Sequence, residues 1–108
     1  MPMPSDEIIA ALVARGRQLI VAGDIPNARL VLQQAADAGN ATAALELGET
    51  YDPSMQQLPL PGGRVGIGEA GIGEAGIAMA KAWYEKARDL GSAEAAVRLE
   101  RLSGRDQR

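Results

Sequence analysis

The sequence predicts an all-α protein: five helices in a short right-handed α-α superhelix, made of two helix pairs plus a capping helix. Three observations lead to this prediction. Apolar residues recur at steps of three and four along most of the chain. Aromatic residues make up only 3% of the 108 residues, so Ala, Leu, Ile and Val must build the core. Part of the sequence also repeats itself. The length is typical of a single domain, residues 1–108.

The first helix is expected to follow a short lead-in over residues 1–5, which contains two prolines. Ser5 or Asp6 can cap its start, and Gly23 is placed to end it. The helix then buries a single apolar stripe that consists of Ile8, Ile9, Leu12, Val13, Leu19 and Ile20.

The second and third helices are marked by the same kind of signals. Asp24 can cap the second helix, and Gly39 is placed just after its end. Asn40 can cap a third helix that runs to about Tyr51. Pro53 then ends it, because the residue before a proline is pushed out of the helical conformation.

Residues 53–76 have a different composition. They hold three of the six prolines and seven of the thirteen glycines, and they include the tandem pentads 66–70 and 71–75. We expect a long mobile loop that is either functional or a neutral expansion.

The pentads also create a GxGxxG pattern. Nucleotide binding through that pattern requires a preceding strand, and the sequence predicts none.

The fourth helix is expected over residues 77–90, before Gly91. Ser92 can cap a fifth helix that extends to about Ser103, and residues 104–108 are expected to fray. Along this last helix Glu94 and Arg98 are four residues apart. This spacing is typical of an ion pair on an exposed helix face.

The chain contains an internal repeat. Seven of the thirteen residues 35–47 are identical to those at 87–99, a spacing of 52. At the other end Gly16 and Leu19 recur as Gly48 and Tyr51, a spacing of 32. The chain is therefore a repeated helix pair with an insertion of about 20 residues in its second copy. Small residues are expected where helices approach closely: Gly16, Ala28, Ala35, Gly48, Ala80 and Ala87.

Three motifs carry a family resemblance. They are Ala44-x-x-Leu47-Gly48-x-x-Tyr51, Ala80-x-x-Trp83-Tyr84-x-Lys86-Ala87-x-x-x-Gly91 and Ala95-Ala96-x-x-Leu99. Residues 40–102 resemble the Sel1-like repeat, a subfamily of the tetratricopeptide-type helical repeats, and the run from Gly16 to Ala35 resembles a plain tetratricopeptide unit. Two features depart from the family: Gly76 stands where an Asp is expected, and the connecting loop is longer.

The resemblance implies that the first helix of each pair lines a concave surface for a peptide or partner protein. The partner-binding positions it implies are Val13, Arg17, Ile20, Thr42, Leu45, Glu49, Glu94 and Arg101, with Ala10, Val21, Asp52 and Val97 beside them. A second possibility is that two and a half repeats are too few for a groove. The exposed apolar residues would then serve assembly, with a second copy or with the rest of a longer chain.

Composition argues against several other classes of function. His and Cys are both absent, which removes imidazole and thiol catalysis and the usual zinc ligands. Glu46, Glu49 and Asp52 share one helix face and could hold a cation, but a solvated face is the simpler expectation. We therefore expect no catalytic residue, cofactor or metal, and no enzyme. The net charge of -3 and the scattered cations argue against nucleic acid.

No apolar run is long enough to insert into a membrane, and the N-terminus does not resemble a signal peptide. The protein is expected to be cytoplasmic if the chain is complete. The function predicted first is a non-catalytic protein-interaction module. The alternative is a structural or dimerising terminal domain of a larger bacterial protein, and a homodimer is possible.

Overall fold

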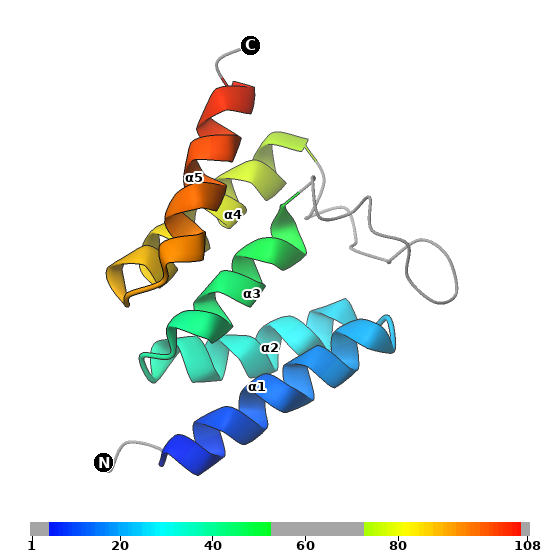
Figure 1. The fold of residues 1–108 in the computed structure, drawn as a ribbon. Coiled ribbons are helices and arrows are strands. Elements are labelled where there is room, and N and C mark those ends of the chain that lie inside the picture. Colours follow the sequence, from blue (N-terminus) through cyan, green and yellow to red (C-terminus); the bar gives the residue numbers. More distant parts are fainter. Residues whose placement is uncertain (1–4, 53–72, 107–108) are drawn as a thin grey trace.

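The computed structural model describes residues 5–52 and 73–106 and is all-helical over those ranges, as the sequence predicts (Figure 1). Its helices are α1 (Asp6–Val21), α2 (Ile25–Asp37), α3 (Ala41–Tyr51), α4 (Gly73–Asp89) and α5 (Ala93–Asp106). None of the helices in the described ranges is both long and apolar enough to cross a membrane.

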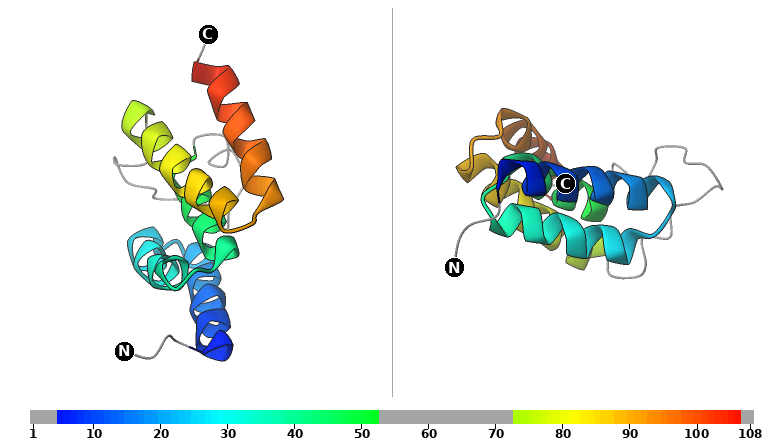
Figure 2. Two further views of the ribbon diagram at one scale, coloured as in Figure 1. Left: turned by 90° about the vertical axis from the view of Figure 1, so that its left-hand side faces the viewer. Right: turned by 90° about the horizontal axis from the view of Figure 1, so that it is seen from below.

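The helices stack in chain order, each packing against the next. Figure 2 shows α2 and α4 on one side of the stack and α1 and α5 on the other, with α3 between them. One apolar core runs through the whole stack, so the two helix pairs form a single unit. Its buried members are Ile9, Val13, Leu32, Ala35, Ala36, Ala43, Ala44, Leu47, Ala80, Tyr84, Ala87, Ala95 and Leu102.

Three tight joints connect the helices, and all three use the same device. Gly23, Gly39 and Gly91 have φ angles of 86°, 98° and 113°, a left-handed conformation that favours glycine. The next residue closes the preceding helix through its main-chain N–H. These bonds are Asp24 N to Leu19 O at 2.8 Å, Asn40 N to Ala35 O at 3.1 Å and Ser92 N to Ala87 O at 2.9 Å.

The residue that closes one helix also caps the next one. The side chains of Asp24, Asn40 and Ser92 each accept a hydrogen bond from the main-chain N–H three residues further on, at 3.4, 2.8 and 3.1 Å. Ser5 does the same for α1 at 3.2 Å. The caps expected from the sequence are confirmed.

Two helical glycines allow the helices of each pair to approach closely. A Cβ built on Gly16 would lie 2.6 Å from Cδ2 of Leu32, and one built on Gly48 would lie 2.5 Å from Cδ1 of Tyr84. Both distances are far below van der Waals contact, so a side chain at either position requires Leu32 or Tyr84 to shift. Because Leu32 and Tyr84 are 52 positions apart, the spacing of the repeat, the same packing contact occurs in both pairs.

Two helix boundaries differ from the prediction. Helix α4 begins at Gly73 rather than Ile77, and α5 extends to Asp106 rather than Ser103. The first turns of α4 contain Glu and Ala, which favour helix, and Gly76 is buried there. Similarly, no proline follows Ser103, and one glycine in a helix costs only about 1 kcal/mol. The rest of the predicted loop, 53–72, lies outside the described residues.

Candidate protein-interaction face

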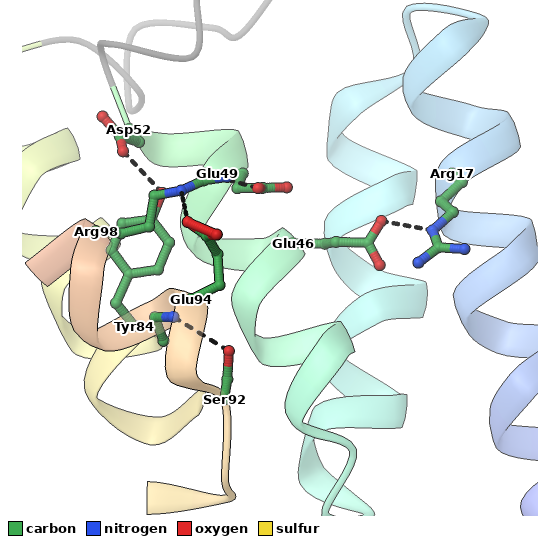
Figure 3. Close-up of polar contacts among 9 residues, drawn as sticks. Arg17, Glu46, Glu49, Asp52, Tyr84, Ser92, Glu94 and Arg98 are labelled. Atoms are coloured by element: carbon green, nitrogen blue, oxygen red, sulfur yellow. Dashed lines mark hydrogen bonds and ion pairs between the residues drawn. The ribbon is translucent and has the colours of Figure 1, made fainter. Parts of the chain in front are cut away.

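Two ion pairs connect helices that are not neighbours in sequence (Figure 3). Arg17 Nε on α1 lies 2.7 Å from Glu46 Oε1 on α3, and Arg98 Nη1 on α5 lies 2.7 Å from Glu49 Oε2 on α3. We call the surface that carries these pairs the α1/α3/α5 face. Its charged residues are Arg17, Glu46, Glu49, Glu94, Arg98 and Arg101.

The two ion pairs are the same contact made twice, with the charges reversed. Arg17 and Glu49 are separated by the repeat spacing of 32, and Glu46 and Arg98 by the spacing of 52. In each case a residue late in one helix reaches an earlier position on the next helix of the face. At the first junction, between α1 and α3, the cation is on the earlier helix. At the second junction, between α3 and α5, the cation is on the later helix.

Arg98 is the centre of the second junction. Its guanidinium contacts Glu94 at 3.3 Å as well as Glu49, and its side chain is only 15% exposed. Burial acts to lower the pKa of Arg98, but the neighbouring Glu49, Tyr84 and Glu94 reverse this and the net shift is upward. The pair with Glu94 is present as expected. The expectation of a simple exposed pair is wrong, because Arg98 is mostly enclosed.

Glu49 is enclosed with its partner. Burial raises the pKa of its carboxyl, and nearby Glu46 and Asp52 add to the effect, while Arg98 opposes it. The side chain of Glu49 is 25% exposed, so the ion pair is shielded from solvent more than a typical surface pair. Glu49 therefore acts mainly in holding α5 against α3.

In the ion pair of the first junction the cation is exposed and the carboxylate is mostly buried. The Arg17 side chain is 59% exposed, whereas that of Glu46 is 13% exposed. The hydrogen bond and charge of Glu46 raise the pKa of Arg17. The second carboxylate oxygen, Glu46 Oε2, is buried and has no hydrogen-bond partner among the described residues. Glu46 is thus fixed from one side only, by a cation that faces solvent.

A buried hydrogen bond lies behind the second junction. The Tyr84 hydroxyl on α4 donates to Asp52 Oδ2 at the end of α3, over 2.7 Å (Figure 3). Burial and the bond to Asp52 both raise the pKa of Tyr84. Asp52 is only 1% exposed, so its expected place on the partner-binding surface is wrong. The signal was present in the repeat, where Tyr84 replaces Leu32 and a buried hydroxyl needs a partner.

The structure divides the predicted partner-binding residues into three groups. Arg17, Thr42, Glu94 and Arg101 are exposed, together with Ala10, Val21 and Val97. Ile20 and Leu45 are partly buried against the core. Val13 is 7% exposed and belongs to the core, so its predicted surface role is wrong. The apolar stripe of α1 is simply wide enough to include it.

The two carboxylates of α3 and that of Asp52, which follows the helix, are all bonded within the protein. Glu46 pairs with Arg17, Glu49 pairs with Arg98, and Asp52 accepts from Tyr84. In the described ranges no group of three acidic, His or Cys side chains is placed to hold a metal ion. The solvated helix face expected for these carboxylates is also wrong, because they form contacts between helices.

Arg29 contacts the end of α3 in a way that the sequence did not predict. Arg29 on α2 donates from Nε to Thr50 Oγ1 at 3.1 Å and from Nη2 to Thr50 O at 2.8 Å. Its guanidinium also lies 3.8 Å from the centre of the Tyr51 ring. A cation that bonds the last carbonyls of a helix stabilises its end. Burial lowers the pKa of Arg29.

The chain matches no protein-family model, no curated protein and no solved structure. The function must therefore be inferred from the residues and contacts of the chain itself.

Proposed function

We propose that this chain is a non-catalytic protein-interaction module of the Sel1-like type, which binds a peptide or partner protein on its α1/α3/α5 face. One observation carries the proposal: the helices of this face are tied to each other at two places by ion pairs of 2.7 Å. A surface held in this way loses little conformational freedom on binding, which favours affinity.

The exposed side chains of the face suit an amphipathic segment. Arg17 and Arg101 offer positive charge, Glu94 offers negative charge, and Val97 is an apolar contact with 47% of its surface exposed. Peptides that dock on helical surfaces use such a mixture of apolar anchors and charges. A right-handed superhelix, as the resemblance to Sel1-like repeats implies, would curve this face around the ligand.

The test is capture followed by quantitative binding. The immobilised wild-type chain is used to capture proteins from a lysate, and the affinity of each captured protein is then measured by calorimetry. The variant Arg17→Gln with Thr42→Arg alters two exposed positions of the face. The control is Gln33→Arg, an exposed position on α2 at the other side of the stack.

We expect the face variant to weaken binding at least tenfold and the control to bind as the wild type does. Circular dichroism must show that all three proteins are equally helical. A partner that binds the face variant and the wild type with equal affinity would contradict the proposal. Failure to capture any protein would also count against it.

The alternative function, a structural or dimerising terminal domain of a larger bacterial protein, has one observation in its favour. Ile8 and Val21 on α1 and Leu30 on α2 are large apolar side chains that are 54%, 62% and 61% exposed. Such side chains favour contact with another protein surface. Sedimentation equilibrium over a hundredfold concentration range tests it: a dimer that Val21→Ser weakens supports this function, and a constant monomer mass opposes it.

A further inference from the structure

Helix α5 repeats, on its outer side, two residues that α1 uses for packing. Val13 and Arg17 lie four positions apart on α1, and Val97 and Arg101 lie four positions apart on α5. The two repeat spacings, 32 and 52, together carry Val13 to Val97 and Arg17 to Arg101. The same residue types therefore stand at equivalent positions at the two ends of the stack.

On α1 both residues are engaged, although the Arg17 side chain is still 59% exposed. Val13 is 7% exposed, and Arg17 bonds to Glu46 of α3. On α3 the equivalent residues are also engaged: Leu45 packs against the core, and Glu49 bonds to Arg98 of α5. At both junctions the charged residue at this position bonds to the next helix of the face.

On α5 the same positions are open. Val97 is 47% exposed, and Arg101 is exposed. Among the residues that the structure describes, Arg101 forms no ion pair. We define Val97 and Arg101 as the α5 edge. The α5 edge therefore has the same residue types as the equivalent positions of α1, and within the described part of the chain no helix covers it.

The way in which a partner can cover this edge is restricted by Glu100. Glu100 stands at the position equivalent to Gly16 and Gly48, where Leu32 and Tyr84 pack closely against a bare backbone. A side chain at that position excludes a helix that packs as α2 and α4 do. The remaining contact that a partner can copy is the one between α3 and α1, in which an acidic residue meets the cation.

A second copy of this chain that continued the stack would not supply that acidic residue. If α1 of a second copy lay on the α5 edge, the residue in the place of Glu46 would be Ala14, which is neutral. Charge complementarity therefore requires a different helix. We propose that the α5 edge docks a helix of a partner protein that carries a glutamate or aspartate in the place that Glu46 holds on α3. This inference rests on the proposed function.

The probe is a peptide with the sequence of residues 40–51, acetylated, amidated and held helical by a hydrocarbon staple between positions 44 and 48. Glu49 is replaced by Gln in the peptide, so that Glu46 is its single carboxylate. Binding of the labelled peptide to the full chain is measured by fluorescence anisotropy. The control variant of the chain is Arg15→Glu, an exposed arginine on α1.

We expect Arg101→Glu and Val97→Asp each to weaken peptide binding at least tenfold, and Arg15→Glu to leave it unchanged. A peptide with Glu46→Arg should bind poorly to the wild-type chain and regain binding to the Arg101→Glu chain. Amide chemical shifts in an NMR titration should change around positions 97 and 101. Because both altered residues are exposed, the variants are expected to fold, which circular dichroism checks.

Three results would overturn the inference. The first is that Arg101→Glu leaves peptide binding intact. The second is that the amide shift changes centre on Arg17, where the peptide would displace α3. The third is self-association of the chain that Arg101→Glu abolishes, because this would place a second copy on the α5 edge. The proposed function fails separately: it falls if no captured partner depends on Arg17 and Thr42, whatever the stapled peptide does.

Discussion

Gly48 shows how one residue controls the distance between two helices. Its missing side chain lets the Tyr84 ring lie against the backbone of α3, and that ring carries the hydroxyl that reaches Asp52. At the equivalent place in the first pair, Gly16 faces the aliphatic side chain of Leu32. A leucine can change rotamer, whereas the tyrosine ring is held at both ends.

We therefore predict that Gly48→Ala destabilises the protein by about 1–3 kcal/mol through overpacking. The better helix propensity of alanine offsets about 0.5–1 kcal/mol of this. Gly16→Ala should cost less, because Leu32 can move. Urea denaturation of the two variants beside the wild type measures both effects. Equal stability of Gly48→Ala and the wild type would contradict the close approach of α3 and α4.

The buried Tyr84 hydroxyl gives a second prediction at the scale of the residue. Tyr84→Phe keeps the ring but removes the hydrogen bond of 2.7 Å to Asp52. A hydrogen bond to a charged group contributes about 1.5–3 kcal/mol, and we expect a loss in that range. A double-mutant cycle with Asp52→Asn, measured by urea denaturation, isolates the pair. Additive single effects would show that the bond contributes nothing.

At the scale of the element, the two ion pairs of the α1/α3/α5 face should differ in strength. Arg17 is 59% exposed, so the coupling between Arg17 and Glu46 should be about 0.2–1 kcal/mol. The side chains of Glu49 and Arg98 are 25% and 15% exposed, so their coupling should be larger. Double-mutant cycles with neutral replacements measure both. A stronger Arg17–Glu46 coupling would contradict the assigned burial.

The Glu49 carboxyl also makes the free energy of unfolding depend on pH. Burial raises its pKa in the folded protein, although Arg98 opposes this, so the native state binds the proton more tightly than the unfolded chain does. The stability that Glu49 contributes is then full below the pKa of the unfolded chain and is lost as pH rises through the folded pKa.

We predict that the wild type loses free energy of unfolding, relative to Glu49→Gln, as pH rises from about 4 to about 7. Urea denaturation of the two proteins at several pH values in this range gives the difference directly. A wild type that gains on the variant over the same range would show that Arg98 outweighs burial at this carboxyl.

The helices and their joints could be predicted because their causes are local. Glycine at the joint and Asp, Asn or Ser after it decide where α2, α3 and α5 begin, whatever lies around them. The start of α4 was misplaced because glycines and the tandem pentads were interpreted as a loop. In the structure Gly73 begins the helix and Gly76 is buried within it.

The candidate site was predicted only in part, because its contacts join distant parts of the chain. The Arg17–Glu46 bond spans 29 positions, and the spacing of three between Glu46 and Glu49 says nothing about the cations they meet. The repeat held the missing information. Aligned at its two spacings, the repeat makes Arg17 equivalent to Glu49 and Glu46 equivalent to Arg98. The cation and the anion therefore exchange places between the two junctions, and this exchange predicts an ion pair at each junction.

At the scale of the whole molecule, stability should decrease from the middle of the stack to its ends. Helix α3 packs against both α2 and α4, whereas α1 and α5 each have one principal neighbour. In stacked repeats each unit is stabilised mainly by its neighbours. We predict that amide hydrogen exchange is slowest in α3 and at least tenfold faster in α5. Mass spectrometry of exchanged peptides measures this, and equal protection of α3 and α5 would contradict it.

The three glycine joints have a consequence for how such a chain can change in evolution. A stretch that runs from one joint to the next carries its own start signal and its own stop signal, as residues 24–39 do between Asp24 and Gly39. A genetic duplication or exchange with its ends at these glycines would therefore deliver a helix that is already capped at both ends. The likeness between residues 35–47 and 87–99 includes the joint itself, so the signal that ends one helix and the signal that begins the next recur together.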